Sequence, residues 1–212
     1  MTDFTLYCFL ESGNSYKPAI MLELCEANWQ AQWVNFFKAE HRSPEYLAMN
    51  SMGEVPALVD HTLDNAVINQ SGVMLLHLSK HFDKFGPDND EEYREIMRWI
   101  LFDNHKLTGN LAVYRFLNKF MNKGDTPEAE FMQGRMIQAF KVLNRHLEGR
   151  DWTVGNKPTI ADLSMIGYLY WPDHYNVTWD EYPNIKAWLE RITNLPNYKT
   201  PEEILPTGPV SA

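Results

Sequence analysis

The sequence lacks the features that mark a membrane, secreted or nucleic-acid-binding protein. Its 212 residues hold no run near the ~20 apolar residues that a membrane-spanning helix needs. Residues 1–15 lack the pattern of a secretory signal, in which a basic region precedes an apolar stretch. The net charge of -9 is opposite in sign to the basic footprint that binds nucleic acid. We therefore expect a cytoplasmic protein with neither a membrane nor a nucleic-acid partner.

Cysteine is also scarce. Cys8 and Cys25 form neither a C-x-x-C pair nor the spacing of a zinc site. His77 and His81 share a predicted helix but have no third ligand, so no metal site is expected. Because disulfides are rare in the cytoplasm, we expect two buried free thiols.

The first part of the chain has the pattern of an α/β domain. Short apolar runs predict four strands, at residues 3–10, 31–37, 55–60 and 66–69. Helical spacing between and after these runs predicts the order β-α-β-α-β-β-α. Either Asn14 or Ser15 is expected to cap the first helix, because both side chains accept hydrogen bonds from a first helical turn.

The pattern changes after a polar stretch at residues 83–90, which indicates a linker. Only helices are predicted beyond it, at residues 91–121 with a bend near Gly109, and at 126–149, 158–171 and 184–194. The last residues, 201–212, are expected to form a loose tail. The predicted domains are thus 1–82, an α/β domain, and 91–212, an all-helical domain.

A strand that begins with proline makes the stretch "GEVPALVD", residues 53–60, informative. Proline cannot donate a hydrogen bond to a sheet. In a thioredoxin-like unit, the third strand opens with a cis-proline, which leaves the preceding N–H and C=O free to pair with a peptide-like ligand. On this interpretation Val55 holds the ligand and Pro56 directs it. A trans-proline on an edge strand is the alternative.

Two other stretches have a defined local chemistry. In "NQSG", residues 69–72, Gln70 and Ser71 open a helix whose first N–H groups attract anions, although a plain helix cap is the alternative. In "PTIAD", residues 158–162, Thr159 and Asp162 form a predicted capping box. We assign that box a structural role.

These stretches carry a resemblance to a known family. "NSMGEVPALVD", "INQSGVMLLHL" and "KPTIADLSMIGYL" resemble the corresponding motifs of cytosolic glutathione transferases of bacterial type, with Ser51 in place of the usual proline. The resemblance covers essentially the whole chain. It implies a thioredoxin-like α/β domain followed by an all-α domain. It also implies a homodimeric detoxification enzyme that uses glutathione as co-substrate and no metal.

The same resemblance implies a chemistry. The thiolate of glutathione would attack a small electrophile, a peroxide or a disulfide; a binding or scaffold protein of the same fold is the alternative. Lowering a thiol pKa by about two units takes roughly 2.7 kcal/mol. One hydrogen bond to a charged group contributes ~1.5–3 kcal/mol. Alignment with related motifs gives this role to Ser12 and Asn14, with Ser15 and, more weakly, Tyr7 as alternatives.

The remaining predicted contacts depend on charge and position. The glycine carboxylate of glutathione needs a basic partner, for which Lys38, His41 and Arg42 are candidates. Glu54 is discordant, because relatives often carry lysine there and a carboxylate would repel those of the ligand. The pocket for the electrophile is expected along the helix after residue 90. Its candidate lining residues are Phe102, Lys106, Tyr114 and Arg115.

Overall fold

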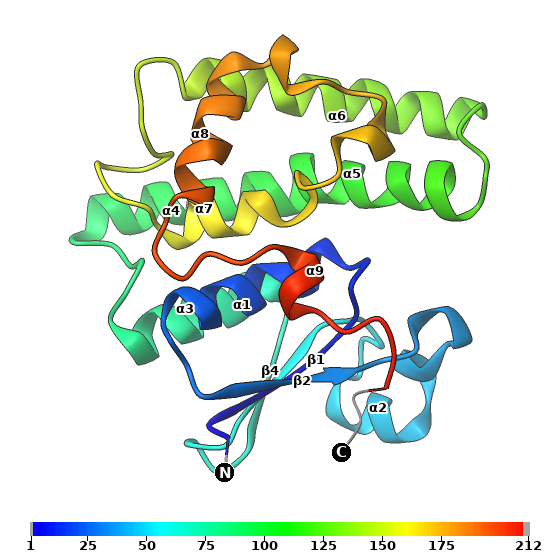
Figure 1. Cartoon of the computed structure of the whole chain (residues 1–212), viewed down its shortest axis with the longest axis vertical. Coiled ribbons are helices and arrows are strands. Elements are labelled where there is room, and N and C mark those ends of the chain that lie inside the picture. The colour runs from blue at the N-terminus through cyan, green and yellow to red at the C-terminus, as the bar shows by residue number, and fades with distance from the viewer. Residues whose placement is uncertain (1, 210–212) are drawn as a thin grey trace. The chain divides into compact units, whose positions relative to one another are not determined.

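The computed structural model describes residues 2–209 and contains two compact units (Figure 1). One unit takes in the chain up to Lys84 and again from Leu195, and the other runs from Phe85 to Asn194. The first unit carries a sheet and the second is helical, which confirms the predicted fold class. The predicted boundaries at residues 82 and 91 stay a prediction.

The first unit is built on a four-stranded sheet with the strand order β2-β1-β3-β4. Its strands are β1 (Phe4–Cys8), β2 (Trp29–Trp33), β3 (Ala57–Asp60) and β4 (Ala66–Asn69). The pairing of β1 with β2 is parallel, whereas β3 runs antiparallel to both β1 and β4. The helices of this unit are α1 (Gly13–Leu24), α2 (Pro44–Met49), α3 (Ser71–Phe82) and α9 (Pro201–Ile204). Helices α1 and α3 pack side by side on the sheet (Figure 1).

Two local features of this unit differ from the prediction. The second strand ends at Trp33 rather than at residue 37, because the Asn35 side chain accepts a hydrogen bond from the Lys38 N–H and starts a 3-10 turn. Helix α1 is capped by Ser12, not by Asn14 or Ser15. The Ser12 Oγ accepts from the Ser15 N–H at 3.1 Å.

The segment predicted as a loose tail is ordered as far as Pro206, so that prediction was wrong there. The Leu10 N–H donates to the Pro206 carbonyl at 3.1 Å, and the Leu205 side chain is buried. The Tyr16 hydroxyl donates to the Lys199 carbonyl at 2.7 Å. Packing on α1 orders this segment, and no local pattern could indicate that. Residues 210–212 of the predicted tail lie outside the described residues.

The second unit contains α4 (Asp90–Phe102), α5 (Thr108–Arg115), α6 (Pro127–His146), α7 (Ile160–Met165) and α8 (Pro183–Thr193). The helix predicted at residues 91–121 is interrupted by a π-helical turn at Asp103–Leu107. A Cβ atom at Gly109 would lie 2.8 Å from the Asn104 carbonyl oxygen. The irregularity therefore requires glycine close to the predicted bend.

One buried carboxylate ties together three segments of the second unit. Asp162 and Thr159 form the predicted capping box at the start of α7. The Asp162 carboxylate also accepts from the Thr153 N–H at 3.0 Å and from the Trp188 Nε1–H at 2.9 Å. Burial raises the pKa of Asp162, and its hydrogen bonds oppose that rise. The capping box therefore anchors a loop and α8 in addition to its own helix.

Replacing Asp162 with Asn should lower the free energy of unfolding by about 2–4 kcal/mol, because an amide NH2 would face buried N–H donors. Urea denaturation followed by circular dichroism measures the change. The matched control is Glu203→Gln in the exposed capping box of α9, which should lower the free energy of unfolding much less. Equal losses in the two variants would contradict the anchoring role.

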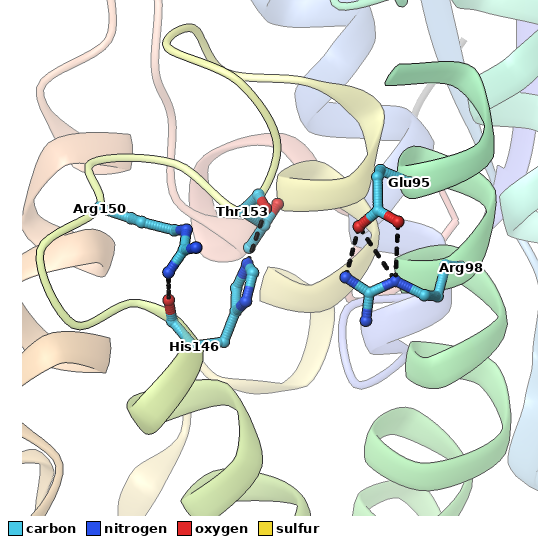
Figure 2. Close-up of polar contacts among 5 residues, drawn as sticks. All are labelled: Glu95, Arg98, His146, Arg150 and Thr153. Carbon is cyan, nitrogen blue, oxygen red and sulfur yellow. Dashed lines mark hydrogen bonds and ion pairs between the residues drawn. The ribbon is translucent and has the colours of Figure 1, made fainter. Parts of the chain in front are cut away.

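A second polar cluster lies where α6 ends (Figure 2). The His146 Nε2–H donates to the Thr153 carbonyl at 2.8 Å, and Arg150 donates to the His146 carbonyl at 2.9 Å. Glu95 and Arg98 form an ion pair on α4 (Figure 2). Burial lowers the pKa of His146 below its ordinary value of 6.5, and the charges of Arg150 and Arg98 add to that effect.

The free energy of unfolding should therefore fall as the pH drops below about 6.5, because unfolded His146 takes up a proton that the folded side chain resists. His146→Gln should make this decline shallower, measured as the urea midpoint at about pH 7.5 and about pH 5.5. His105→Gln, at an exposed histidine of the same unit, should leave the slope unchanged. A slope unaltered by His146→Gln would refute the assignment.

Candidate functional site

The register of the sheet brings three chain segments to one edge. Tyr7, near the end of β1, lies opposite Ala57 at the start of β3. Ala57 in turn lies opposite Asn69 at the end of β4. The loop after β1, the residues before β3 and the residues after β4 are therefore neighbours. These segments hold eight of the residues predicted at the glutathione site: Ser12, Asn14, Ser15, Glu54, Val55, Pro56, Gln70 and Ser71.

The first turns of α1 and α3 are joined by a hydrogen bond. The Ser71 hydroxyl donates to the Asn14 Oδ1 at 3.3 Å. Because the Ser12 Oγ accepts the capping bond, its own O–H is left to donate elsewhere. Ser15 is fully buried, and its Oγ has no hydrogen-bond partner among the described residues. Ser12 is itself only 4% exposed, so which of Ser12, Asn14 and Ser15 contacts the thiol of a ligand stays a prediction.

The main chain just before β3 is partly unpaired. The Val55–Pro56 peptide bond is cis, as the sequence predicted. Within the described part of the chain, no group pairs with the N–H or C=O of Val55. By contrast, the neighbouring Glu54 carbonyl accepts from the Tyr46 hydroxyl at 2.8 Å and from the Asn50 Nδ2 at 2.7 Å. The segment is therefore held firmly at Glu54 and left free to pair at Val55.

The side chains of Glu54 and Gln70 meet across this edge. The Gln70 Nε2 donates to the Glu54 Oε2 at 2.7 Å, and both side chains are exposed. Gln70 has a φ of 69°, in the left-handed region that is uncommon for residues other than glycine. Such backbone conformations concentrate at functional sites.

The basic candidates lie close to the same segment. His41 is buried and its ring stacks on that of Phe36, with the centroids 4.3 Å apart. Burial, and then the charge of Arg42, lowers the pKa of His41, so the imidazole stays neutral near pH 7. The Arg42 Nη1 donates to the Met52 carbonyl at 3.4 Å. Arg42 therefore supplies a permanent positive charge beside the loop that leads to Glu54. Lys38, the third basic candidate, is exposed and precedes His41 in the same segment of chain.

Tyr7, the weaker candidate for the thiolate, packs in an aromatic and aliphatic cluster. Its ring contacts Tyr46 edge-on at 6.3 Å, and it packs with Ala57 and Val55. This environment places Tyr7 beside the start of β3, and its role at the thiolate stays a prediction.

Two of the four residues predicted to line the electrophile pocket line one groove of the second unit, and the predicted pocket itself stays a prediction. Phe102 and Lys106 line a groove of about 570 Å³ in the second unit, with Phe131 and Val142 from α6. Tyr114 and Arg115 are absent from that groove.

Tyr114 and Arg115 are buried and have partners within the second unit. The Tyr114 hydroxyl accepts from the Gln133 Nε2 at 3.2 Å. The Arg115 Nε donates to the His174 Nδ1 at 2.9 Å, and its guanidinium lies 4.0 Å from the centroid of the Trp171 ring. Burial, and then the charge of Arg115, lowers the pKa of His174. Both predicted residues thus contribute to packing in this unit.

The two cysteines are buried free thiols, as predicted. Burial raises the pKa of both, that of Cys25 to about 11. Neither is therefore a thiolate near pH 7, and thiolate chemistry at this edge requires a sulfur from a ligand. In residues 2–209, no helix is long and apolar enough to cross a membrane, and no three His, Cys, Asp or Glu side chains are grouped to hold a metal ion.

The residues whose hydrogen bonds fix the main chain of this edge were not identified from the sequence. Tyr46 and Asn50 hold the Glu54 carbonyl, and Pro206 holds the amide of Leu10 in the loop before Ser12. The sequence contained one indication of Asn50, because this residue is the first of the family-like motif at residues 50–60 that contains Val55. The other two depend on tertiary packing alone.

Comparison with known families gives two matches that together cover most of the chain. Residues 12–81 match the N-terminal domain of glutathione S-transferases, and residues 106–196 match their C-terminal domain. The N-terminal match takes in the edge described above, and the C-terminal match takes in most of the helical unit.

Curated relatives include glutathione S-transferases and URE2 proteins. Glutathione S-transferase 2 of Schizosaccharomyces pombe is 27% identical, over 97% of both chains. Protein URE2 of Eremothecium gossypii is 26% identical over 92% of this chain, and the Saccharomyces cerevisiae protein is named transcriptional regulator URE2. The chain spans 58 to 66% of the length of the first URE2 proteins that it matches. The structure of Ure2p in complex with glutathione is similar with a TM-score of 0.86, 25% identity, and coverage of 92% of this chain and 96% of that one.

Proposed function

Because the chain belongs to the glutathione S-transferase superfamily, we propose that it binds glutathione at the edge formed by Ser12, Val55 and Gln70. The observation that carries this proposal is the unpaired main chain of Val55, which an extended peptide can pair with as an added strand does. In this arrangement the cysteine of glutathione lies against Val55. Gln70 and Ser71 receive the γ-glutamyl carboxylate, at a helix end that favours anions.

The glycine carboxylate lies toward the 3-10 turns after β2. His41 contributes a neutral ring there, and Arg42 contributes the positive charge that the carboxylate requires. This local charge matters because the protein as a whole has a net charge of -9.

The proposed chemistry is formation of a bond between sulfur and an electrophile. The Ser12 hydroxyl and the Asn14 amide donate hydrogen bonds to the bound sulfur, and the first turn of α1 adds its dipole. These interactions favour the thiolate over the thiol. The thiolate then attacks an electrophilic carbon and displaces its leaving group. Alternatively, it attacks a peroxide oxygen, which breaks the O–O bond and releases an alkoxide or hydroxide, or a disulfide sulfur, which breaks the S–S bond and releases a thiolate. We propose that the protein is cytoplasmic and that its co-substrate is a small electrophile.

A second function has its own support. Relatives named URE2 include a transcriptional regulator, and a Ure2p structure contains glutathione. A protein that binds glutathione with little catalysis therefore fits the same site. Turnover with a chlorodinitrobenzene substrate distinguishes an enzyme from such a binding protein.

Calorimetry with glutathione tests the site, and thiolate absorbance against pH tests the chemistry. Removing the hydroxyl in Ser12→Ala should raise the pKa of the bound thiol by about 1–2 units, since a hydrogen bond to a charge contributes ~1.5–3 kcal/mol. Asn14→Ala should raise it in the same direction, whereas Thr207→Ala, at an exposed hydroxyl, should not.

Two outcomes would count against this assignment. Absent or millimolar binding of glutathione would overturn the proposed site. Binding that is intact with no change of pKa in Ser12→Ala or Asn14→Ala would transfer the role to Ser15 or Tyr7.

The homodimer implied by the family is also part of this proposal. The apolar groove lined by Phe102, Phe131 and Val142 supports it, because the Phe131 side chain is 62% exposed. Contiguous exposed apolar side chains typically mark an interaction surface.

Light scattering should therefore give a mass of about twice the 24.8 kDa of one chain. Phe131→Glu should shift the mass toward the monomer, because a buried charge without a partner opposes association. Leu63→Glu changes a side chain of similar exposure in the first unit and should leave the mass unaltered. A monomeric wild-type protein would rule the dimer out.

A further inference from the structure

Glu54 lies in the proposed site, and its negative charge would repel both carboxylates of glutathione. Its main chain is nevertheless fixed by hydrogen bonds from buried side chains. Its carbonyl accepts from Tyr46 and Asn50, which are 5% and 1% exposed. The N–H of the preceding Gly53 donates to the Asn50 carbonyl at 2.8 Å. The side chain therefore projects from a fixed position into the edge where the ligand is proposed to lie.

The partner of the Glu54 carboxylate is neutral. Its Oε2 accepts from the Gln70 Nε2 at 2.7 Å, and no ion pair to Glu54 is found in residues 2–209. A carboxylate only accepts hydrogen bonds, so it fixes the orientation of the Gln70 amide. The NH2 group of Gln70 faces Glu54, which leaves the Gln70 Oε1 as an acceptor. The pair thus presents acceptor oxygens and one carboxylate that forms no ion pair within the described residues, while the Arg42 side chain lies beside the preceding Gly53.

Such an arrangement is complementary to an ammonium group. The γ-glutamyl end of glutathione carries an ammonium and a carboxylate on the same carbon atom. If the carboxylate lies at Ser71, the ammonium lies near the adjacent Gln70, because both groups are attached to one carbon atom. The Gln70 side chain is hydrogen-bonded to Glu54. Arg42 lies beside the same loop, where its Nη1 donates to the Met52 carbonyl, and it forms no ion pair with Glu54 among the described residues. The Glu54 carboxylate is thus open to a ligand cation.

We infer that Glu54 is a specificity-determining residue whose carboxylate receives the α-ammonium group of the ligand. This inference rests on the proposed function, and it narrows the ligand to peptides with a free zwitterionic γ-glutamyl end. The negative charge of Glu54 then favours binding of glutathione through the ammonium group, although the same charge would repel the two carboxylates of the ligand. A γ-glutamyl group that lacks the ammonium meets only the unfavourable charge.

The test compares two ligands and two proteins by calorimetry at about pH 6.5, where an α-amino group is protonated. The ligands are glutathione and its des-amino analogue, in which a glutaryl group replaces γ-glutamyl. Glu54→Gln keeps the size of the side chain and an oxygen that can accept from Gln70. It should weaken glutathione binding about fivefold, the scale of one partly exposed ion pair, and should not weaken binding of the analogue.

The matched control is Glu45→Gln, which removes the same charge from an exposed position on α2 and should leave both affinities unchanged. Circular dichroism and thermal unfolding confirm that each variant is folded. Glutathione binding that is unchanged or tighter in Glu54→Gln, while wild-type binding is intact, would overturn the role of Glu54 alone. A wild-type protein that binds neither ligand would overturn the proposed function and this inference together.

Discussion

The antiparallel pairing of β1 with β3 is the constraint on which the site depends. The register that sets Tyr7 opposite Ala57, and Ala57 opposite Asn69, fixes where each strand ends. Because a shift of one residue would turn every side chain of a strand to the other face, burial of Leu6 and Leu58 specifies this register strongly. The site is consequently a product of core packing, and four of its polar side chains, those of Ser12, Ser15, His41 and Ser71, are themselves buried.

Supporting contacts then hold the segments that the register has placed. Tyr46 and Asn50 fix the carbonyl of Glu54, and the Pro206 carbonyl fixes the amide of Leu10. The helical unit uses the same principle, since the Asp162 carboxylate satisfies donors from a loop and from α8. In both units, hydrogen bonds from or to buried polar groups determine the position of irregular chain.

The charges at the proposed site alternate in sign, although the chain as a whole is acidic. Arg42 adds a positive charge close to a neutral His41, while Glu54 adds a negative charge beside Gln70. A zwitterionic peptide with a carboxylate at each end and one ammonium matches this alternation. The same geometry serves catalysis or simple binding, since either function requires the peptide to be held first.

The sequence by itself determined the fold class, the order of the elements in the first unit and the capping box of Thr159 and Asp162, because these depend on periodicity and on neighbours in the chain. It also indicated the cis bond before Pro56. The cap of α1 at Ser12 is a local hydrogen bond that the sequence analysis assigned to a neighbouring residue. Tertiary structure alone decided that the C-terminal segment is ordered to Pro206, and that Phe102 and Tyr114 lie in different surroundings. Those outcomes depend on which distant groups meet, and no local pattern of side chains encodes that.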